Sequence, residues 1–379
     1  MKVQMGRDIR SAHTARADSG AAASELIARL DGEDPTAIAF FASHRHDGKK
    51  LGRELRQAFP RAQVVGCTTA GELTQAVSST GGVSALALGK SVVRRAAAAL
   101  APFDAGVGEG IAAATQAIGR ALDLDLRTAD PNRYVGIALI EGLKMKEEAA
   151  NDALGNAAPL LSFVGGSAGD DGEFVRTRVF CNGDECDDGA ALIVLDAAVP
   201  FAIGKTCSFE PKSHKLVVTR ADTRNRVLYE LDGRPVLDVY AEILGKRLDG
   251  NSADVFMTNP LGLMIDGKPW IRSPQRVLPD GSLKFYCQLA EGAEVYVMQS
   301  TDLVEDTRRE LARVASVLGG AIRGGFAFNC ILRRLELDAK GWHGRFLETF
   351  SGIEMAGFHT YGESWLGHIN QTLTGLWFR

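Results

Sequence analysis

A pattern that occurs twice in the first half of the chain most constrains its fold. The segment VVGCTTAGE runs from Val64 to Glu72, and FVGGSAGDD runs from Phe163 to Asp171. Each begins with apolar residues and a glycine, continues through small residues and ends on an acidic side chain. A short apolar run followed by small residues predicts a buried strand that enters a turn. We interpret the recurrence as an internal duplication within residues 36–200.

Strand and helix patterns alternate around both segments. Leu51, Leu55 and Phe59 are four residues apart, which places them on one face of a helix. The patterns predict helices at 24–30, 49–59, 110–122 and 147–158. They predict strands at 36–43, 62–72, 81–88, 134–142, 161–171 and 189–195. Alternation of this type predicts the α/β class, as layered α+β with mixed β-sheets flanked by helices.

The length of the chain favours more than one domain. With 379 residues it exceeds the size of a typical single core. We predict a polar N-terminal arm and helix over 1–30, an N-terminal domain over 31–220 and a C-terminal domain over 221–379.

The second half adds another set of elements. Asp232-Gly233 predicts a turn, and Pro235 favours the first turn of a helix. Asp302 as N-cap and Gly319-Gly320 as C-cap frame an amphipathic helix. The predicted strands are VFMTNP (255–260), KFYCQL (284–289), EVYVMQS (294–300) and FAFNCILRRLEL (326–337).

Composition and charge argue against several classes of protein. The net charge is −4 and no basic run is present, so nucleic acid is not an expected partner. The longest apolar stretches are too short to span a bilayer. The first residues hold no apolar segment and no cleavage site, so we expect no signal peptide. Six scattered cysteines favour a reducing cytoplasm over a disulfide framework.

Few motifs indicate enzymatic chemistry. The sequence contains no phosphate-binding G-x-x-x-x-G-K-[ST] loop, no H-E-x-x-H and no paired C-x-x-C. Cys67 lies where the predicted strand enters its small-residue turn, a place that could expose a nucleophile, although a small packing residue explains it as well. Cys181 and Cys186 are expected to be turn cysteines exposed to solvent. His44 and His46 fit a polar loop, with metal binding as the alternative.

Two histidines near the C-terminus are the most ligand-like residues. His359 lies in GFHTYGES beside Phe358 and Tyr361, and His368 lies in GHINQTLTG beside Asn370. A histidine among aromatic and small residues is most often a hydrogen-bonded core residue. Neutral imidazole is also the common proximal ligand of non-covalent haem, and flanking glycines would let a flat ring approach the backbone.

Several motifs together resemble the FIST family. They are GCTTAGE (66–72), GGSAGDD (165–171), LYELDGRPVLDVY (228–240), FNCILRR (328–334), GFHTYGE (357–363) and HINQTLTG (368–375). The family consists of bacterial signal-transduction sensors with an N-terminal and a C-terminal FIST domain. The resemblance covers the chain from about Pro35 onward and places the FIST N domain at 31–220 and the FIST C domain at 221–379.

A chain of this kind looks similar to the stand-alone nitric-oxide-sensing haemoproteins called NosP. That resemblance implies a b-type haem, nitric oxide as ligand, and control of biofilm or cyclic-di-GMP signalling. Its implied partner is a histidine kinase or a diguanylate cyclase/phosphodiesterase, and a homodimer is possible. On this interpretation His359, and after it His368, ligates the iron. The wall is lined by apolar and aromatic residues: Phe358, Tyr361, Ile353 and Trp365.

The resemblance equally allows a haem-free sensor of a small metabolite such as an amino acid. An amino acid would need partners for a carboxylate and an ammonium group. The candidates are Arg333, Glu363, Asn370, Thr372 and the amides of Gly165, Gly166 and Ser167. Both interpretations are binding functions, and an enzyme would depend on Cys67 alone.

Overall fold

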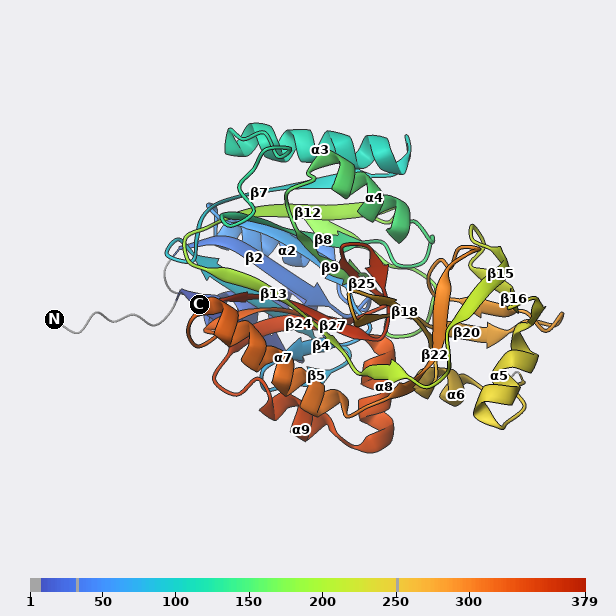
Figure 1. Cartoon of the computed structure of the whole chain (residues 1–379). Helices are drawn as coiled ribbons and strands as arrows, with labels where there is room; N and C mark the ends of the chain where they lie inside the picture. The colour runs from blue at the N-terminus through green and yellow to red at the C-terminus, as the bar shows by residue number, and fades with distance from the viewer. Residues whose placement is uncertain (1–7, 32–33, 250–251) are drawn as a thin grey trace.

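The computed structural model describes residues 8–31, 34–249 and 252–379, and it shows an α/β protein (Figure 1). Within that part of the chain, three six-stranded sheets form a body and a fourth sheet forms a separate lobe. We number them in chain order: sheet 1 contains β1 (Ile9–Thr14), sheet 2 contains β8 (Tyr134–Ile140), sheet 3 contains β13 (Phe201–Cys207), and sheet 4 is the sheet of the separate lobe. No helix in the described ranges has both the length and the apolar character needed to cross a bilayer.

The first two repeats have the same order of elements, which confirms the predicted duplication. The first repeat is β1 (Ile9–Thr14), α1 (Ser19–Leu30), β2 (Pro35–Ala42), α2 (Gly48–Ala58), β3 (Gln63–Thr68), β4 (Glu72–Thr74), β5 (Ser78–Ser79) and β6 (Val83–Gly89). The second is β7 (Val93–Pro102), α3 (Val107–Leu122), β8 (Tyr134–Ile140), α4 (Glu147–Ala157), β9 (Phe163–Ser167), β10 (Val179–Cys181), β11 (Asp184–Cys186) and β12 (Gly189–Ala197).

A third repeat, which the sequence pattern did not reveal, completes the body. It is β13 (Phe201–Cys207), α7 (Leu303–Leu318), β23 (Gly324–Cys330), α8 (Ile331–Lys340), α9 (His343–Glu348), β24 (Glu354–Thr360), β25 (Glu363–Trp365), β26 (His368–Ile369) and β27 (Thr372–Phe378). Its sheet has the strand order β13-β27-β23-β24, which matches β1-β6-β2-β3 and β7-β12-β8-β9. The duplication is therefore part of a threefold repeat.

The three repeats exchange hairpins in a cycle. The hairpin β4–β5 of the first repeat joins sheet 3, where Glu72 pairs with Phe358. The hairpin β10–β11 of the second repeat joins sheet 1, where Val179 pairs with Cys67. The hairpin β25–β26 of the third repeat joins sheet 2 beside β9. Each sheet is thus completed by its neighbour.

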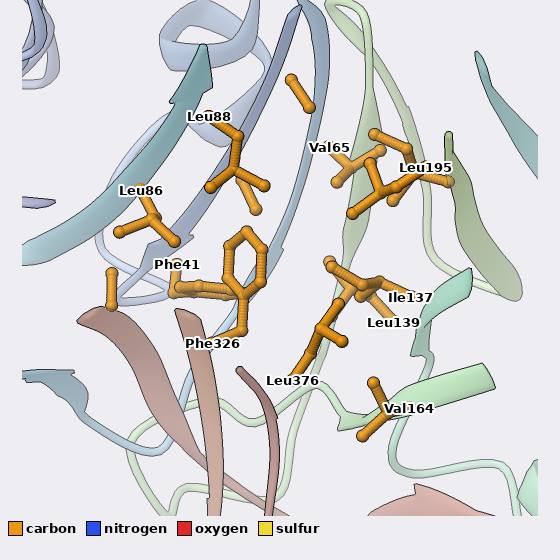
Figure 2. Close-up of a cluster of buried hydrophobic side chains, with 14 of the residues drawn as sticks. Phe41, Val65, Leu86, Leu88, Ile137, Leu139, Val164, Leu195, Phe326 and Leu376 are labelled. Atoms are coloured by element: carbon orange, nitrogen blue, oxygen red, sulfur yellow. The ribbon is translucent and has the colours of Figure 1, made fainter. Parts of the chain in front are cut away.

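One apolar core lies between the three sheets, and helices cover their outer faces. Figure 2 shows Phe41 of sheet 1, Ile137 of sheet 2 and Phe326 of sheet 3 in this core, together with Leu86 of sheet 1 and Leu376 of sheet 3. Outside it, α1 and α2 pack on sheet 1, α3 and α4 on sheet 2, and α7, α8 and α9 on sheet 3. Near-continuous apolar strands such as β2 and β8 are explained by this burial on both faces.

The fourth sheet belongs to an inserted subdomain, residues 209–300, between β13 and α7. Its elements are β14 (Phe209–Pro211), β15 (Leu216–Asp222), β16 (Val227–Leu231), β17 (Arg234–Pro235), α5 (Val236–Leu244), α6 (Ala253–Thr258), β18 (Leu261–Ile265), β19 (Lys268–Arg272), β20 (Pro274–Val277), β21 (Leu283–Phe285) and β22 (Glu294–Ser300). It has its own apolar core and forms the yellow and orange lobe in Figure 1.

Three sequence-based predictions of local structure were wrong. Part of the predicted arm is strand β1, which pairs with β6, and residues 1–7 lie outside the described range. VFMTNP is mostly helix α6, because tertiary packing overrides the strand propensity of a short apolar run. FAFNCILRRLEL is strand β23 up to Cys330 and helix α8 afterwards. The division after residue 220 stays a prediction, and that position lies inside β15.

Candidate functional site

Three equivalent turns meet at the centre of the body. Aligned without gaps, GCTTAGE, GGSAGDD and GFHTYGE occupy the same place in the three repeats, after β3, β9 and β24. Backbone hydrogen bonds close a ring among them. The donors and acceptors are Ala70 N to His359 O (2.9 Å), Gly169 N to Thr68 O (3.0 Å) and Tyr361 N to Ser167 O (3.1 Å). The ring holds most of the predicted site residues in one region.

The glycines predicted to bind a carboxylate serve strand packing in this structure. A Cβ on Gly165 would lie 1.9 Å from the carbonyl oxygen of Ala138, and one on Gly166 would lie 2.6 Å from Thr360 Cγ2. Both residues pair with β25, and the amide of Ser167 donates to Gly362 O at 2.7 Å. These backbone groups are engaged within the sheets.

Glu363 is fully buried and secures its own turn. Its carboxylate accepts hydrogen bonds from the Thr360 hydroxyl and from the amide and hydroxyl of Thr372, the latter two at 3.0 and 2.6 Å. Burial raises the pKa of Glu363 to about 7. Glu72, its equivalent in the first repeat, has a pKa raised by burial to about 7 as well. The acidic end of the repeated motif therefore has a structural role.

His359 is completely buried and both ring nitrogens have partners. Nε2 lies 2.9 Å from the Ser78 hydroxyl, and Nδ1 lies 3.0 Å from Asn329 Nδ2. Burial, reinforced by Arg334, lowers the pKa of His359 well below its usual value. Phe358 stacks on Phe41 in the central core, with ring centroids 5.0 Å apart. His359 presents no free nitrogen to a ligand.

Arg333 is also buried, beneath the first turn of α8. It donates to Asn329 Oδ1 at 2.9 Å, to the Ser208 hydroxyl at 3.0 Å and to the Thr307 hydroxyl at 2.9 Å. Its side chain joins α8 and α7 to the residue where the inserted subdomain begins. It lies outside the lining of the cavity described next.

A cavity of about 170 Å³, here the seam pocket, lies between the body and the inserted subdomain. The body contributes residues after β8, the start of α8, Phe174 and the two predicted residues Tyr361 and Asn370. The inserted subdomain contributes Arg226, Gln275, Lys284, Phe285 and Tyr286. Ligands of α/β proteins bind beyond the carboxyl ends of the strands, which is where this pocket lies.

Two buried polar atoms of the seam pocket have no hydrogen-bond partner within the described structure. They are Nε of Arg226 and Oδ1 of Asn370, in side chains that are 6% and 1% exposed. The amino end of α8 faces the same cavity through Cys330, Ile331 and Leu332 and has no side-chain cap. An unpaired donor and an unpaired acceptor on residues that line one pocket indicate a polar ligand.

Ion pairs cross the seam beside the pocket. The guanidinium of Arg226 contacts Glu147 Oε2 at 2.7 Å and also Glu148, both on α4. Burial, together with Arg226, lowers the pKa of Lys284.

The phenol of Tyr361 donates to Asp170, and its ring stacks on Phe174 with centroids 4.7 Å apart. Burial, followed by this bond to Asp170, raises the pKa of Tyr361.

His368 lies elsewhere on the same seam. It is 4% exposed, and neither ring nitrogen has a hydrogen-bond partner among the described residues. It lines a cleft of about 400 Å³ together with Trp270, Arg272, Ile265 and Leu366. Burial lowers the pKa of His368, while Glu147 and Glu148 oppose that effect. Burial therefore favours the neutral imidazole, and both of its nitrogens lack a partner in the described structure.

The remaining candidates are explained by packing. Cys67 is buried, and burial raises the pKa of its thiol well above the usual value. Cys181 is buried, contrary to the expected exposed turn, and Cys186 is half-buried. His44 lies 3.3 Å from Asp171 in a loop. In the described ranges, no three His, Cys, Asp or Glu side chains are grouped as a metal site.

Sequence reasoning missed the residues that the inserted subdomain brings to the seam pocket. Arg226 and Lys284 are each more than forty positions from any predicted site residue, and neither lies in a chemical motif. Their place depends on how the subdomain folds back on the body. Pairings between distant segments leave no local signal.

Comparisons with known proteins identify the family of this chain. A model of the FIST N domain matches residues 36–234, and a model of the FIST C domain matches residues 237–365. An uncharacterised protein of Methanocaldococcus jannaschii is 21% identical over 287 residues, covering 69% of this chain and 52% of that protein. The chain thus spans about half the length of the curated relative it matches. It belongs to the FIST family, whose domains are sensor domains of signal-transduction proteins.

Proposed function

We propose that this protein senses a small polar metabolite bound in the seam pocket. The observation that carries the proposal is that two residues lining this one pocket, Arg226 and Asn370, have buried atoms without a partner in the described structure, Nε and Oδ1. A ligand there contacts the body and the inserted subdomain together. Binding can therefore bias how the two parts sit, which is what a sensor requires.

The two atoms define the chemistry of the ligand. Arg226 Nε and the amino end of α8 favour a negatively charged acceptor, since a helix N-terminus and a guanidinium both stabilise anions. Asn370 Oδ1 requires a donor such as an ammonium or hydroxyl group. A cavity of about 170 Å³ admits only a small molecule. A small amino acid supplies both groups within this size.

The test is calorimetric titration and thermal unfolding with a panel of amino and hydroxy acids. We expect at least one to raise the unfolding temperature, because a ligand at 100 times its Kd stabilises the folded state by about 2.7 kcal/mol. Asn370→Leu should abolish that gain. The matched control is Arg220→Ala, which removes an exposed arginine of the same subdomain. A panel without any binder would overturn the proposal.

A second candidate is nitric-oxide sensing through a b-type haem, and the free nitrogens of His368 favour it. The donor fits, because a neutral buried imidazole is the usual axial ligand. Ile265, Trp270 and Leu366 would supply an apolar wall, and Arg272 would hold a propionate. The haem would supply an iron centre that binds nitric oxide. His359, with both nitrogens bonded, fits this role less well than His368.

The haem candidate predicts a clear spectroscopic result. After reconstitution, wild type should show a Soret band in the ferric and ferrous states that shifts when nitric oxide is added. His368→Ala should lose the band, while His359→Ala should keep it if the variant folds. Absorption spectra with circular dichroism as a folding control check this. The absence of a stoichiometric band in wild type would exclude the haem candidate.

The signalling context is proposed from family membership. A sensor domain of this family would act on a histidine kinase or cyclic-di-GMP enzyme in the cytoplasm, as a monomer or homodimer. Biofilm control would follow from such a partner. The high pKa of buried Cys67 keeps its thiol neutral, which supports binding over thiol catalysis. Neither nucleic acid nor a membrane is part of the proposal.

A further inference from the structure

The inserted subdomain is joined to the body by two adjacent crossings. The chain leaves the body at Ser208 and returns at Thr301, and the amide of Thr301 donates to Ser208 O at 2.9 Å. Arg333 anchors this point, since it donates to the Ser208 hydroxyl at 3.0 Å from the first turn of α8. That turn also forms part of the seam pocket. Two adjacent crossings held at one point have the form of a hinge.

The apolar cores stop at the seam. Each cluster of buried apolar side chains among the described residues belongs either to the body or to the inserted subdomain, with half-buried Cys207 at the crossing the exception. The contacts away from the hinge are mostly polar, apart from one aromatic stack of Trp270 on Trp365 with ring centroids 6.3 Å apart. They include the Arg226 ion pairs, Gln288 N to Glu148 Oε1 (2.8 Å) and Ser273 Oγ to Gln371 Oε1 (2.6 Å). Polar interfaces of this kind favour relative motion of the two parts.

The seam is also incompletely paired. Buried polar atoms without a partner occur there on four side chains: Arg226, Trp365, His368 and Asn370. Each such atom costs free energy in the closed arrangement, and opening the seam would let water pair with it. The ion pairs of Arg226 therefore stabilise the closed seam, and the unpaired atoms of these four side chains destabilise it.

We infer that the inserted subdomain is a hinged lid over the seam pocket, open part of the time in the free protein and closed by ligand. Arg226 holds the lid closed, because its guanidinium pairs with Glu147 and Glu148 across the seam. A ligand that pairs with Arg226 Nε and Asn370 Oδ1 removes the cost of closure and shifts the population toward the closed state. The inference rests on the proposed metabolite site and adds how that site is regulated.

Hydrogen exchange of the ligand-free protein tests the lid. The amide of Gln288 bonds to Glu148 across the seam and reports opening, while the amides of β22 report unfolding of the subdomain itself. In wild type we expect Gln288 to exchange at least tenfold faster than β22. Arg226→Ala should accelerate Gln288 at least tenfold further. Asn370→Leu should slow it at least threefold, because closure then buries an apolar group in place of an unpaired carbonyl.

A control variant and the rate of β22 distinguish opening of the lid from unfolding of the subdomain. Arg220→Ala, in the same subdomain but away from the seam, should change neither rate. An unchanged Gln288 rate in Asn370→Leu would overturn the lid. So would an equal acceleration of Gln288 and β22 in Arg226→Ala, because the ion pair would then stabilise the subdomain's fold. The measurement needs no ligand, so its failure leaves the metabolite titration standing. Failure of that titration would remove the closing ligand but not the opening motion of the free protein.

Discussion

Gly357→Ala is expected to destabilise the protein by about 3 kcal/mol or more. A Cβ at this position would lie 1.7 Å from the carbonyl oxygen of Ala327 on the neighbouring parallel strand. That oxygen belongs to the backbone of β23 in the middle of sheet 3, so it cannot move aside without separating two central strands. Urea or thermal unfolding followed by circular dichroism measures the loss.

The threefold repeat provides a graded series for the same measurement. Gly165, the equivalent in the second repeat, would place its Cβ 1.9 Å from the Ala138 carbonyl oxygen. At Gly66, in the first repeat, the nearest atoms belong to the ring of Phe40 at 2.6 Å, with the Phe40 carbonyl oxygen at 2.7 Å. We expect Gly165→Ala to resemble Gly357→Ala, and Gly66→Ala to cost less because the clash is milder and a ring can shift.

Gly155→Ala is the matched control. Gly155 lies in α4, and its added Cβ would meet no atom within 4 Å. Alanine there should stabilise the protein by about 0.4–1 kcal/mol, because it reduces the freedom of the unfolded chain. If Gly357→Ala were as mild as this control, close strand approach would not explain the shared glycine of the three motifs.

The sequence predicted strands and helices well where one apolar run coincides with one element. β2, α2, β8 and α7 were all expected close to their observed bounds. The third repeat was missed because the inserted subdomain separates β13 from α7 by 95 positions. The motif GFHTYGE carries the shared glycine and acidic end, but its histidine and tyrosine hide the small-residue pattern.

The candidate site was predictable only in part. Tyr361 and Asn370 line the seam pocket, while Arg333 and Glu363 complete hydrogen-bond networks below the surface. The sequence of a motif is the same whether its charged residue lines a cavity or lies in a core. Only the packing of the folded protein distinguishes these two positions. The exchanged hairpins illustrate the same limit, since Glu72 pairs with Phe358, which lies in the other half of the chain.

Arg333→Ala is expected to lower the free energy of unfolding by about 3 kcal/mol or more. The substitution leaves Asn329 Oδ1 without its donor and opens a cavity beneath α8, beside the hinge at Ser208. Removal of a buried guanidinium also relieves its desolvation, which opposes the loss. We expect the cavity and the broken network to outweigh that relief, since Arg333 bonds to α7 through Thr307 as well. Chemical unfolding measures the balance.

Arg333→Met separates the two contributions. Methionine fills much of the same volume without the charge, so the cavity term is largely removed while the hydrogen bonds stay broken. We expect this variant to be about half as destabilised as Arg333→Ala. Arg308→Ala, which removes an exposed arginine of α7, should change stability by no more than about 0.5 kcal/mol. An Arg333→Ala variant of wild-type stability that failed only to bind amino acids would contradict the structural role and make Arg333 a ligand contact.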